Sequence, residues 1–258
     1  MDKVTRKITY SAILLAFGIV STMVFKTIPM GNFSFLRFSL TPSIVIFASI
    51  ALGPLYGAVV GVFSDMIPAF LLPHGAYNFY LSFVYLLLGV LPYFLFKFVK
   101  RFPKIFGNRI AVFSFLGLLF LALASVFYLS DSLDASFGEV GYWLKPLILA
   151  LTGVAVIGSI VLMEVVHKRK AMDGQKTNDG SDIYSISFVT ISSEALLMSV
   201  LKAAAFWLYF VTFSNDSPFS YWYFLSMLVI GTIPSSLIDA CFVMWSLSFS
   251  KRFIDERK

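Results

Sequence analysis

Long apolar segments separated by short polar ones recur along the whole chain. Runs of about 18 or more apolar residues are long enough to cross the hydrocarbon core of a membrane as a helix. The pattern predicts eight such segments, the second of them short, at residues 8–29, 39–52, 54–72, 79–99, 110–130, 145–166, 184–213 and 220–249. The expected fold class is therefore an all-α polytopic membrane protein with about eight transmembrane helices.

Composition supports one membrane domain spanning residues 1–258. Hydrophobic residues make up 59% of the chain and charged residues 13%, with a mean hydropathy of +0.85. Soluble domains are about half apolar and a quarter charged. The clearest interruption is residues 167–183, which lack apolar periodicity and are expected to form a flexible cytoplasmic linker. Gly53-Pro54 predicts a tight turn between the second and third spans.

Lysine and arginine residues lie almost entirely on one side of the predicted spans. Sixteen of the 20 fall before the first span, between the fourth and fifth, between the sixth and seventh, and after the last. The connections on the other side contain the acidic or neutral stretches SDSLDASFGEV and SNDSPFS. Cytoplasmic loops carry an excess of positive charge, so both termini are expected in the cytoplasm, which requires an even number of spans.

Charged side chains inside or beside the spans are the candidates for function, because charge in a bilayer is costly unless it is paired or faces a cavity. The cations outside the cytoplasmic clusters are Lys26, Arg37, Lys145 and Lys202, and the acids within spans are Asp65, Glu164, Glu194 and Asp239. Glu164 and Asp239 are placed near cytoplasmic helix ends and interpreted as interfacial. Asp65 and Lys202 lie deeper.

Two interpretations of the deeper charges stay open. Arg37 and Lys202, with Lys26 nearby, would form a site for an anionic solute, since arginine can hold a carboxylate through two hydrogen bonds and lysine supplies a mobile point charge. Alternatively, Lys202 and Asp65 pair with each other as a structural ion pair. In that case Lys26, Arg37 and Lys145 extend toward the outer membrane interface.

The reactive side chains exclude the common enzyme classes. The chain has two histidines, His74 and His167, which lie a bilayer thickness apart and cannot share a metal ion, and a single cysteine, Cys241, which excludes an internal disulfide. No HExxH, GxSxG or GxxxxGK[ST] sequence occurs. We therefore expect no catalysis, metal or cofactor on this chain, and any use of ATP requires a partner subunit.

Glycines at positions 53, 57 and 61 and the carboxylate of Asp65 follow one another at four-residue spacing. On a helix this spacing gives a nearly axial row. Small residues in such a row let another helix backbone approach closely. The glycines are therefore interpreted as architectural, while Asp65 is expected either to line a solute site or to hold Lys202 in place.

Residues 36–77 contain a leucine–arginine pair, a short helix with an early proline, a glycine–proline turn, a glycine-rich helix with an aspartate, and a Pro-x-Gly-x-Tyr loop. These features are Leu36, Arg37, Pro42, Gly53, Pro54, Gly57, Gly61, Asp65, Pro73, Gly75 and Tyr77. In this order they resemble the substrate-binding S components of energy-coupling factor (ECF) vitamin transporters, most closely the folate family. That family continues with Pro-Gly-Phe, where this chain has Asn78-Phe79-Tyr80.

The first span carries Ala12-Ile-Leu-Leu-Ala16, which is similar to the A-x-x-x-A pattern that packs S components against their transmembrane coupling subunit. The last two spans resemble the family's final pair more loosely, through Lys202, Trp207 and Pro234. S components have six spans. The resemblance thus implies a six-helix core plus one extra helix pair, which we place at residues 110–166.

The resemblance implies uptake of a vitamin across the cytoplasmic membrane. An S component binds its vitamin from outside and works with a transmembrane coupling subunit and two cytoplasmic ATPases. The expected cargo is folate or a related small, anionic, heteroaromatic vitamin. The residues expected at the substrate site are Arg37, Asp65, Tyr77, Asn78, Tyr80, Lys202 and Trp207, and those expected at the coupling-subunit interface are Ala12 and Ala16.

Other readings of the same residues remain. The aromatic side chains of the outer loop, which can stack on a flat ring, can equally form an interfacial belt. The chain as a whole could be a membrane scaffold or assembly factor whose buried charges are structural. It could also be a stand-alone secondary transporter with Asp65 as its proton carrier.

Overall fold

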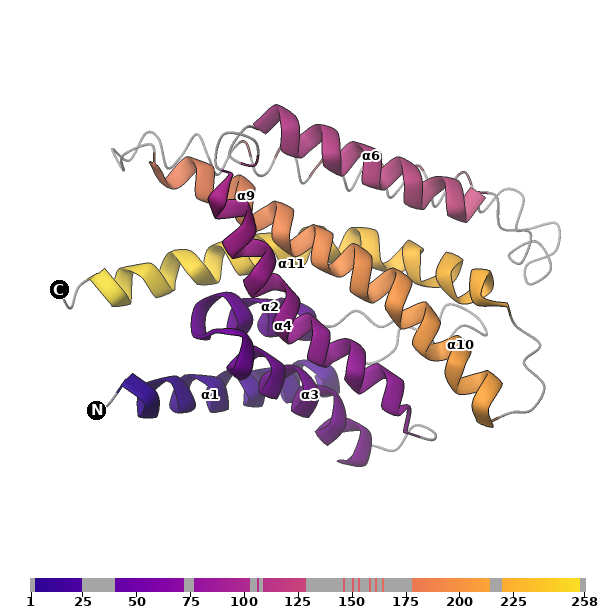
Figure 1. Ribbon diagram of the computed structural model, residues 1–258, viewed down its shortest axis with the longest axis horizontal. Coiled ribbons are helices and arrows are strands. Elements are labelled where there is room, and N and C mark those ends of the chain that lie inside the picture. Colours follow the sequence, from indigo (N-terminus) through magenta and orange to yellow (C-terminus); the bar gives the residue numbers. More distant parts are fainter. Residues whose placement is uncertain are drawn as a thin grey trace.

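The described part of the chain consists of helices that lie side by side in an elongated bundle (Figure 1). The computed structural model describes residues 3–24, 40–71, 77–102, 106, 109–128, 146, 150, 153, 158, 161, 164, 178–213 and 220–255. The helices are α1 (Lys3–Val24), α2 (Thr41–Leu52), α3 (Pro54–Leu71), α4 (Phe79–Arg101), α6 (Arg109–Tyr128), α9 (Asn178–Glu194), the π-helix η1 (Ala195–Leu201), α10 (Lys202–Phe213) and α11 (Tyr221–Asp255). The expected all-α membrane architecture is confirmed.

Helix lengths agree with the predicted spans. The segments long and apolar enough to cross a membrane include Val4–Met23, Pro54–Leu71, Phe79–Arg101 and Tyr184–Phe213, and α2 is the short apolar helix expected second. The start of α1 and the end of α11 lie at the same end of the bundle, as an even number of spans requires (Figure 1). Most of the predicted span 145–166 and most of the linker 167–183 fall outside the described residues. The count of eight and the cytoplasmic placement of the termini stay predictions.

Glycine and proline form the turn between α2 and α3. Gly53 has a φ of 109°, in the left-handed region that glycine adopts without steric cost. Its N–H donates to the carbonyl of Ser49 at 3.1 Å and closes the end of α2. Pro54 then begins α3, where its missing N–H has no helical partner to lose. The predicted Gly53-Pro54 turn is confirmed.

Glycines bring α3 and α4 into backbone contact. A Cβ on Gly57 would overlap the carbonyl oxygen of Gly89, and a Cβ on Gly61 would overlap that of Tyr85. The predicted architectural role is confirmed for these two positions. Gly53 differs, because a Cβ there would meet no atom within 4 Å. Its contribution is the turn alone.

Small and hydroxylated residues join α1 to α2 and α3. A Cβ on Gly18 would lie 3.0 Å from the Cβ of Ser64, so α1 and α3 are close at this point. The Thr41 hydroxyl donates to the carbonyl of Gly18 at 3.2 Å, and it lies 2.8 Å from the hydroxyl of Thr22. These contacts fix the start of the short α2 against the second half of α1.

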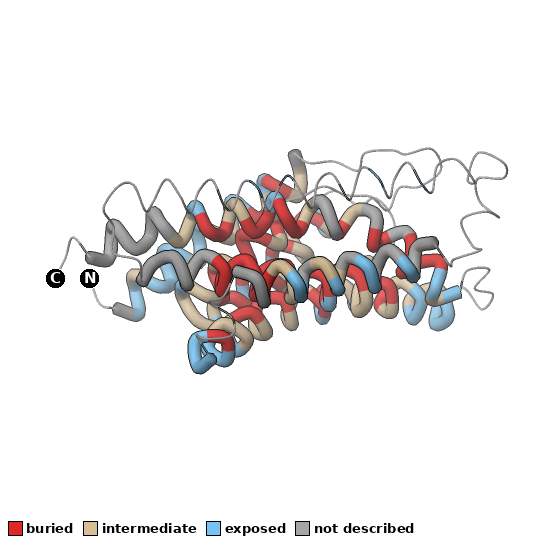
Figure 2. Tube along the Cα trace, turned by 90° about the horizontal axis from the view of Figure 1, so that it is seen from above, coloured by how far each residue is buried: buried red, intermediate tan, exposed pale blue. Residues whose placement is uncertain are grey.

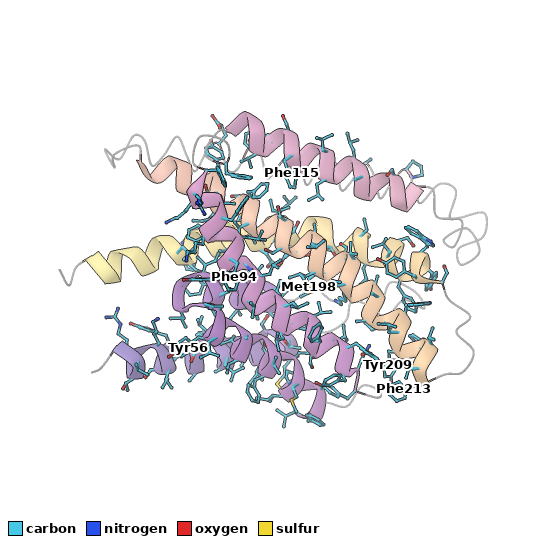
Figure 3. The ribbon with its side chains drawn as sticks, viewed as in Figure 1. Tyr56, Phe94, Phe115, Met198, Tyr209 and Phe213 are labelled. Carbon is cyan, nitrogen blue, oxygen red and sulfur yellow. The ribbon has the colours of Figure 1, made fainter. Side chains whose placement is uncertain are left out.

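The helices of the C-terminal half complete the bundle. α9, η1 and α10 form one continuous helix that packs against α11 and α4, while α6 lies outside this group against α9 and α11 (Figure 1). Phe115 of α6 contacts the ring of Phe188 with centroids 4.7 Å apart (Figure 3). Buried residues concentrate midway along the helices (Figure 2). The core therefore lies where α2, α4, α9 and α11 meet.

Candidate functional site

The row of small residues on α3 ends in a polar contact with α4. The two helices run antiparallel, so Gly61 faces Tyr85 and, one turn further along α3, Asp65 faces Ser82. The Ser82 hydroxyl donates to Asp65 Oδ2 at 2.6 Å. Tyr77 shares a short hydrogen bond with Ser82, and its hydroxyl is the donor because Ser82 gives its own proton to Asp65. The predicted site residues Asp65 and Tyr77 are thus linked through Ser82.

Asn78 joins the start of α4 to α10. Its side-chain oxygen accepts from the N–H of Tyr80 at 3.0 Å, as an N-cap residue does. Its amide nitrogen lies 3.4 Å from the carbonyl oxygen of Ala205. Asn78 is buried, so both halves of its amide group are used inside the protein. This contact brings the loop residues of the predicted site next to the helix that carries Lys202.

Lys202 is the first residue of α10, one turn before Ala205. It interacts electrostatically with Glu194, which lies at the end of α9. The sequence pattern alone predicted no specific role for Glu194. Asp65 lies on α3, and α3 does not pack against α10. Glu194 is thus a carboxylate neighbour of Lys202 that differs from the predicted partner, Asp65. The Asp65–Lys202 ion pair stays a prediction.

The aromatic members of the predicted site lie near the same end of the bundle. The ring of Tyr77 stacks on Phe70 with centroids 5.3 Å apart, and Tyr80 is half-buried. Trp207 is 36% exposed on α10. Tyr209 and Phe213 follow toward the end of that helix, with ring centroids 5.1 Å apart (Figure 3). This end of α10 therefore offers several aromatic rings to a flat ligand.

The remaining cations of the predicted anion site cannot be placed beside these residues. Arg37 and Lys26 lie outside the described part of the chain, and so does Lys145. The residues that the structure brings together are therefore Asp65, Tyr77, Asn78 and Tyr80 at the α3–α4 end, with α10 joined to them through Asn78.

A buried acidic pair lies deeper in the bundle. Asp239, which was interpreted from the sequence as interfacial, is 1% exposed in the middle of the 35-residue α11. Ser43 of α2 donates to Asp239 Oδ1 through a short hydrogen bond, and Glu194 lies beside it.

The sequence contained a signal for this polar interior. Hydroxylated residues recur in the otherwise apolar segment before Glu194, at Ser185, Ser187, Thr190, Ser192 and Ser193. Most of these side chains are buried. A run of hydroxyls in a predicted span is typical of a helix that is enclosed by protein rather than facing lipid. Glu164, by contrast, is half-buried and accepts a hydrogen bond from Tyr184 at 3.3 Å.

The expected coupling surface is an exposed row on α1. Ala12 and Ala16 are both exposed, and Ile8 and Val20 continue the same four-residue spacing with more than half of each side chain exposed. Such a row combines apolar surface with two small residues that permit close helix approach. Its accessibility is what the predicted interface requires.

Comparison with known families gives one finding. A family model described as ECF-type riboflavin transporter, S component, matches residues 3–169, about two thirds of the chain. The match contains α1 to α6, and with them Ala12, Ala16, Asp65 and Tyr77. It also contains residues 110–166, which we expected to be an extra helix pair, and it ends before α9. No curated protein and no solved structure gives a significant match.

Proposed function

The chain belongs to the ECF-type riboflavin transporter S components, and we propose that it binds riboflavin from outside the cell for uptake through partner subunits. The observation that carries this proposal is the family match over residues 3–169. As an S component the chain is a substrate-binding transporter subunit and not an enzyme. Riboflavin replaces folate, because the family description gives no support to the folate part of the resemblance.

The charge around Lys202 favours an uncharged vitamin. Glu194 lies within electrostatic reach of both Lys202 and Asp239, so the ammonium group has acidic neighbours inside the bundle. An anionic vitamin such as folate would have to draw Lys202 away from these buried carboxyl groups, and leaving a buried charge without its partner is strongly unfavourable. Riboflavin is uncharged near neutral pH, so its binding does not require that separation.

The aromatic and polar residues at the α3–α4 end suit such a ligand. We assign Tyr77, Tyr80 and Trp207 to stacking on the flat isoalloxazine ring, and Asp65 and Asn78 to hydrogen bonds with its polar edge or ribityl hydroxyls. Ligand pockets commonly combine aromatic walls with a few placed polar groups. Arg37 stays in the proposed site from the resemblance alone.

Transport requires partners, because the sequence has no nucleotide-binding motif. We propose that the exposed row with Ala12 and Ala16 packs against a transmembrane coupling subunit, and that two ATPase subunits on the cytoplasmic side supply the energy. The chain then acts in the cytoplasmic membrane and binds no cofactor itself.

Titration of the detergent-purified full chain with riboflavin, followed by quenching of the vitamin's fluorescence, tests the proposal. We expect submicromolar affinity that excess folate does not reduce. Trp207→Ala should weaken binding about tenfold or more, the scale of one lost aromatic stacking contact. Trp245→Ala is the matched control, because Trp245 is 61% exposed on α11. Binding of folate in place of riboflavin would contradict the assigned substrate, and binding of neither would contradict the proposed function.

A further inference from the structure

Two carboxyl groups lie together in the middle of the bundle. Glu194 ends α9 just before η1, and Asp239 comes from α11; each is 1% exposed. Their side chains lie within hydrogen-bonding reach of each other. Ser43 donates to Oδ1 of Asp239 from α2, and Lys202 approaches Glu194 from the start of α10.

Three of the four carboxyl oxygens lack a donor among the described residues. They are Oε1 and Oε2 of Glu194 and Oδ2 of Asp239. All three atoms are closed off from solvent. Two ionised carboxylates cannot hydrogen-bond to each other, because neither has a proton to donate. A contact between them becomes a hydrogen bond only when one carries a proton.

The balance of charge also indicates that one of the two carboxyl groups carries a proton. Two ionised carboxylates beside one lysine would leave one negative charge that no described residue compensates in the buried interior of the bundle, which is costly. Like charges at such close range resist joint ionisation, and carboxyl pairs of this kind share one proton. One proton makes the group of Glu194, Asp239 and Lys202 electrically neutral. We propose that Glu194 and Asp239 form a buried proton-binding site that holds one proton between them.

Among the described residues, the other charged groups on the helices around the pair do not change this balance. α2 has no titratable side chain between Thr41 and Leu52. The charged residues of α4, α6, α9 and α11 other than this pair lie at or near the ends of those helices: Lys97, Lys100, Arg101, Arg109, Asp179, Asp182, Lys251, Arg252 and Asp255. The other titratable residues on the surrounding helices are tyrosines and Cys241. Among the described residues, Lys202 is thus the cation that acts on Glu194.

The shared proton joins three helices at one point. Asp239 of α11 contacts Glu194 of α9 and Ser43 of α2 at the same time, next to the start of η1. Loss of the proton leaves two negatively charged carboxylates that repel each other at this junction. The site therefore acts as a proton-sensitive latch between α2, α9 and α11.

Infrared spectroscopy of the detergent-solubilised full chain tests for the proton directly. At neutral pH we expect a carboxylic-acid C=O band that is lost in both Glu194→Gln and Asp239→Asn. Glu164→Gln is the control, since Glu164 is a half-buried acid outside the pair and its loss should leave the band. A wild-type spectrum without the band, or a band that persists in both variants, would overturn the proposal. Vitamin binding plays no part in this measurement.

Thermal unfolding as a function of pH tests the latch. An unfolded carboxyl group gives up its proton at about pH 4. If the folded pair keeps its proton above that pH, the shared proton stabilises the folded state at low pH. This stabilisation is lost as the pH rises, with about a tenfold fall in the folding equilibrium constant per pH unit. Glu194→Gln should remove this dependence, because its amide supplies a permanent donor. A different outcome would be that sodium chloride stabilises the wild type more than choline chloride does, while Glu194→Gln shows no such difference. That outcome would indicate a metal-ion site and would overturn the proposal.

Discussion

The absence of a Cβ atom at Gly57 and at Gly89 sets the distance between α3 and α4. Each lies against the backbone of the other helix, with no room for a side chain between them. The same approach brings Asp65 within reach of Ser82, two turns further along α3 than Gly57. The hydrogen bonds that link Asp65, Ser82 and Tyr77 therefore depend on glycines that do not contact these residues.

Gly57→Ala should destabilise the protein, because the added Cβ would overlap the carbonyl of Gly89 and lie 2.7 Å from the Cα of Ser49. Overpacking of this kind costs about 1–3 kcal/mol, and we expect a lower melting temperature in detergent. Gly117→Ala on α6 is the matched control. It adds the same methyl group where no atom lies within 4 Å, and alanine favours a helix over glycine. Equal melting temperatures for the two variants would show that backbone contact between α3 and α4 does not limit stability.

At the scale of elements, η1 determines which side chains of its helix face each other. Glu194 and Lys202 are eight residues apart, a spacing that leaves an angular offset of about 80° on a regular α-helix. In η1 the N–H of Lys202 donates to the carbonyl of Leu197, five residues back. This wider turn rotates less per residue, which reduces the offset and brings Lys202 toward Glu194. No glycine or proline in residues 195–201 marks the π-helix in the sequence.

At the same scale, the packing of α6 and the family match bear differently on residues 110–166. The structure puts α6 on the outside of the bundle, against α9 and α11, whereas the family match includes this region. The end of α4 and α9 pack against each other, so the chain can pass from one to the other without α6.

Deletion of residues 110–166 tests whether they form an extra helix pair. If the prediction holds, the shortened chain should still fold, because α2, α4, α9 and α11 supply most of the core, to which the deleted range contributes Val112. Monodisperse elution in detergent and retained riboflavin binding are the measurements. An aggregated product would contradict the prediction.

At the scale of the whole molecule, the exposed row on α1 is expected to connect the chain to its transport machinery. The double substitution Ala12→Leu and Ala16→Leu adds bulk to a surface that must approach another helix closely, but it disturbs no buried contact. We expect riboflavin uptake by cells to fall at least about tenfold, consistent with loss of a close helix contact worth more than about 1.4 kcal/mol. Riboflavin binding by the purified chain should stay unchanged.

Ala122→Leu is the control for that experiment. Ala122 is also exposed on a helix, on α6, away from the α1 row. If it lowers uptake as much as the α1 substitutions do, the effect comes from added bulk in general and the assigned interface is wrong. Undiminished uptake by the α1 double variant would lead to the same conclusion.

The sequence by itself determined the features that depend on composition and local spacing. Apolar runs set the helices because lipid cannot satisfy backbone hydrogen bonds. The Gly53-Pro54 turn followed from the conformations those residues allow, and the four-residue spacing of Gly57 and Gly61 predicted a close helix contact.

Only the tertiary structure decided which distant residues meet. Ser82 became the partner of Asp65 through the register of two antiparallel helices, and Ser43 reached Asp239 across 196 positions of sequence. Asp239 is enclosed at the centre because α2 and α9 cover the middle of α11. How deeply a residue is buried, and which distant residue it contacts, depend on the packing between helices. The periodicity of a single helix does not specify either.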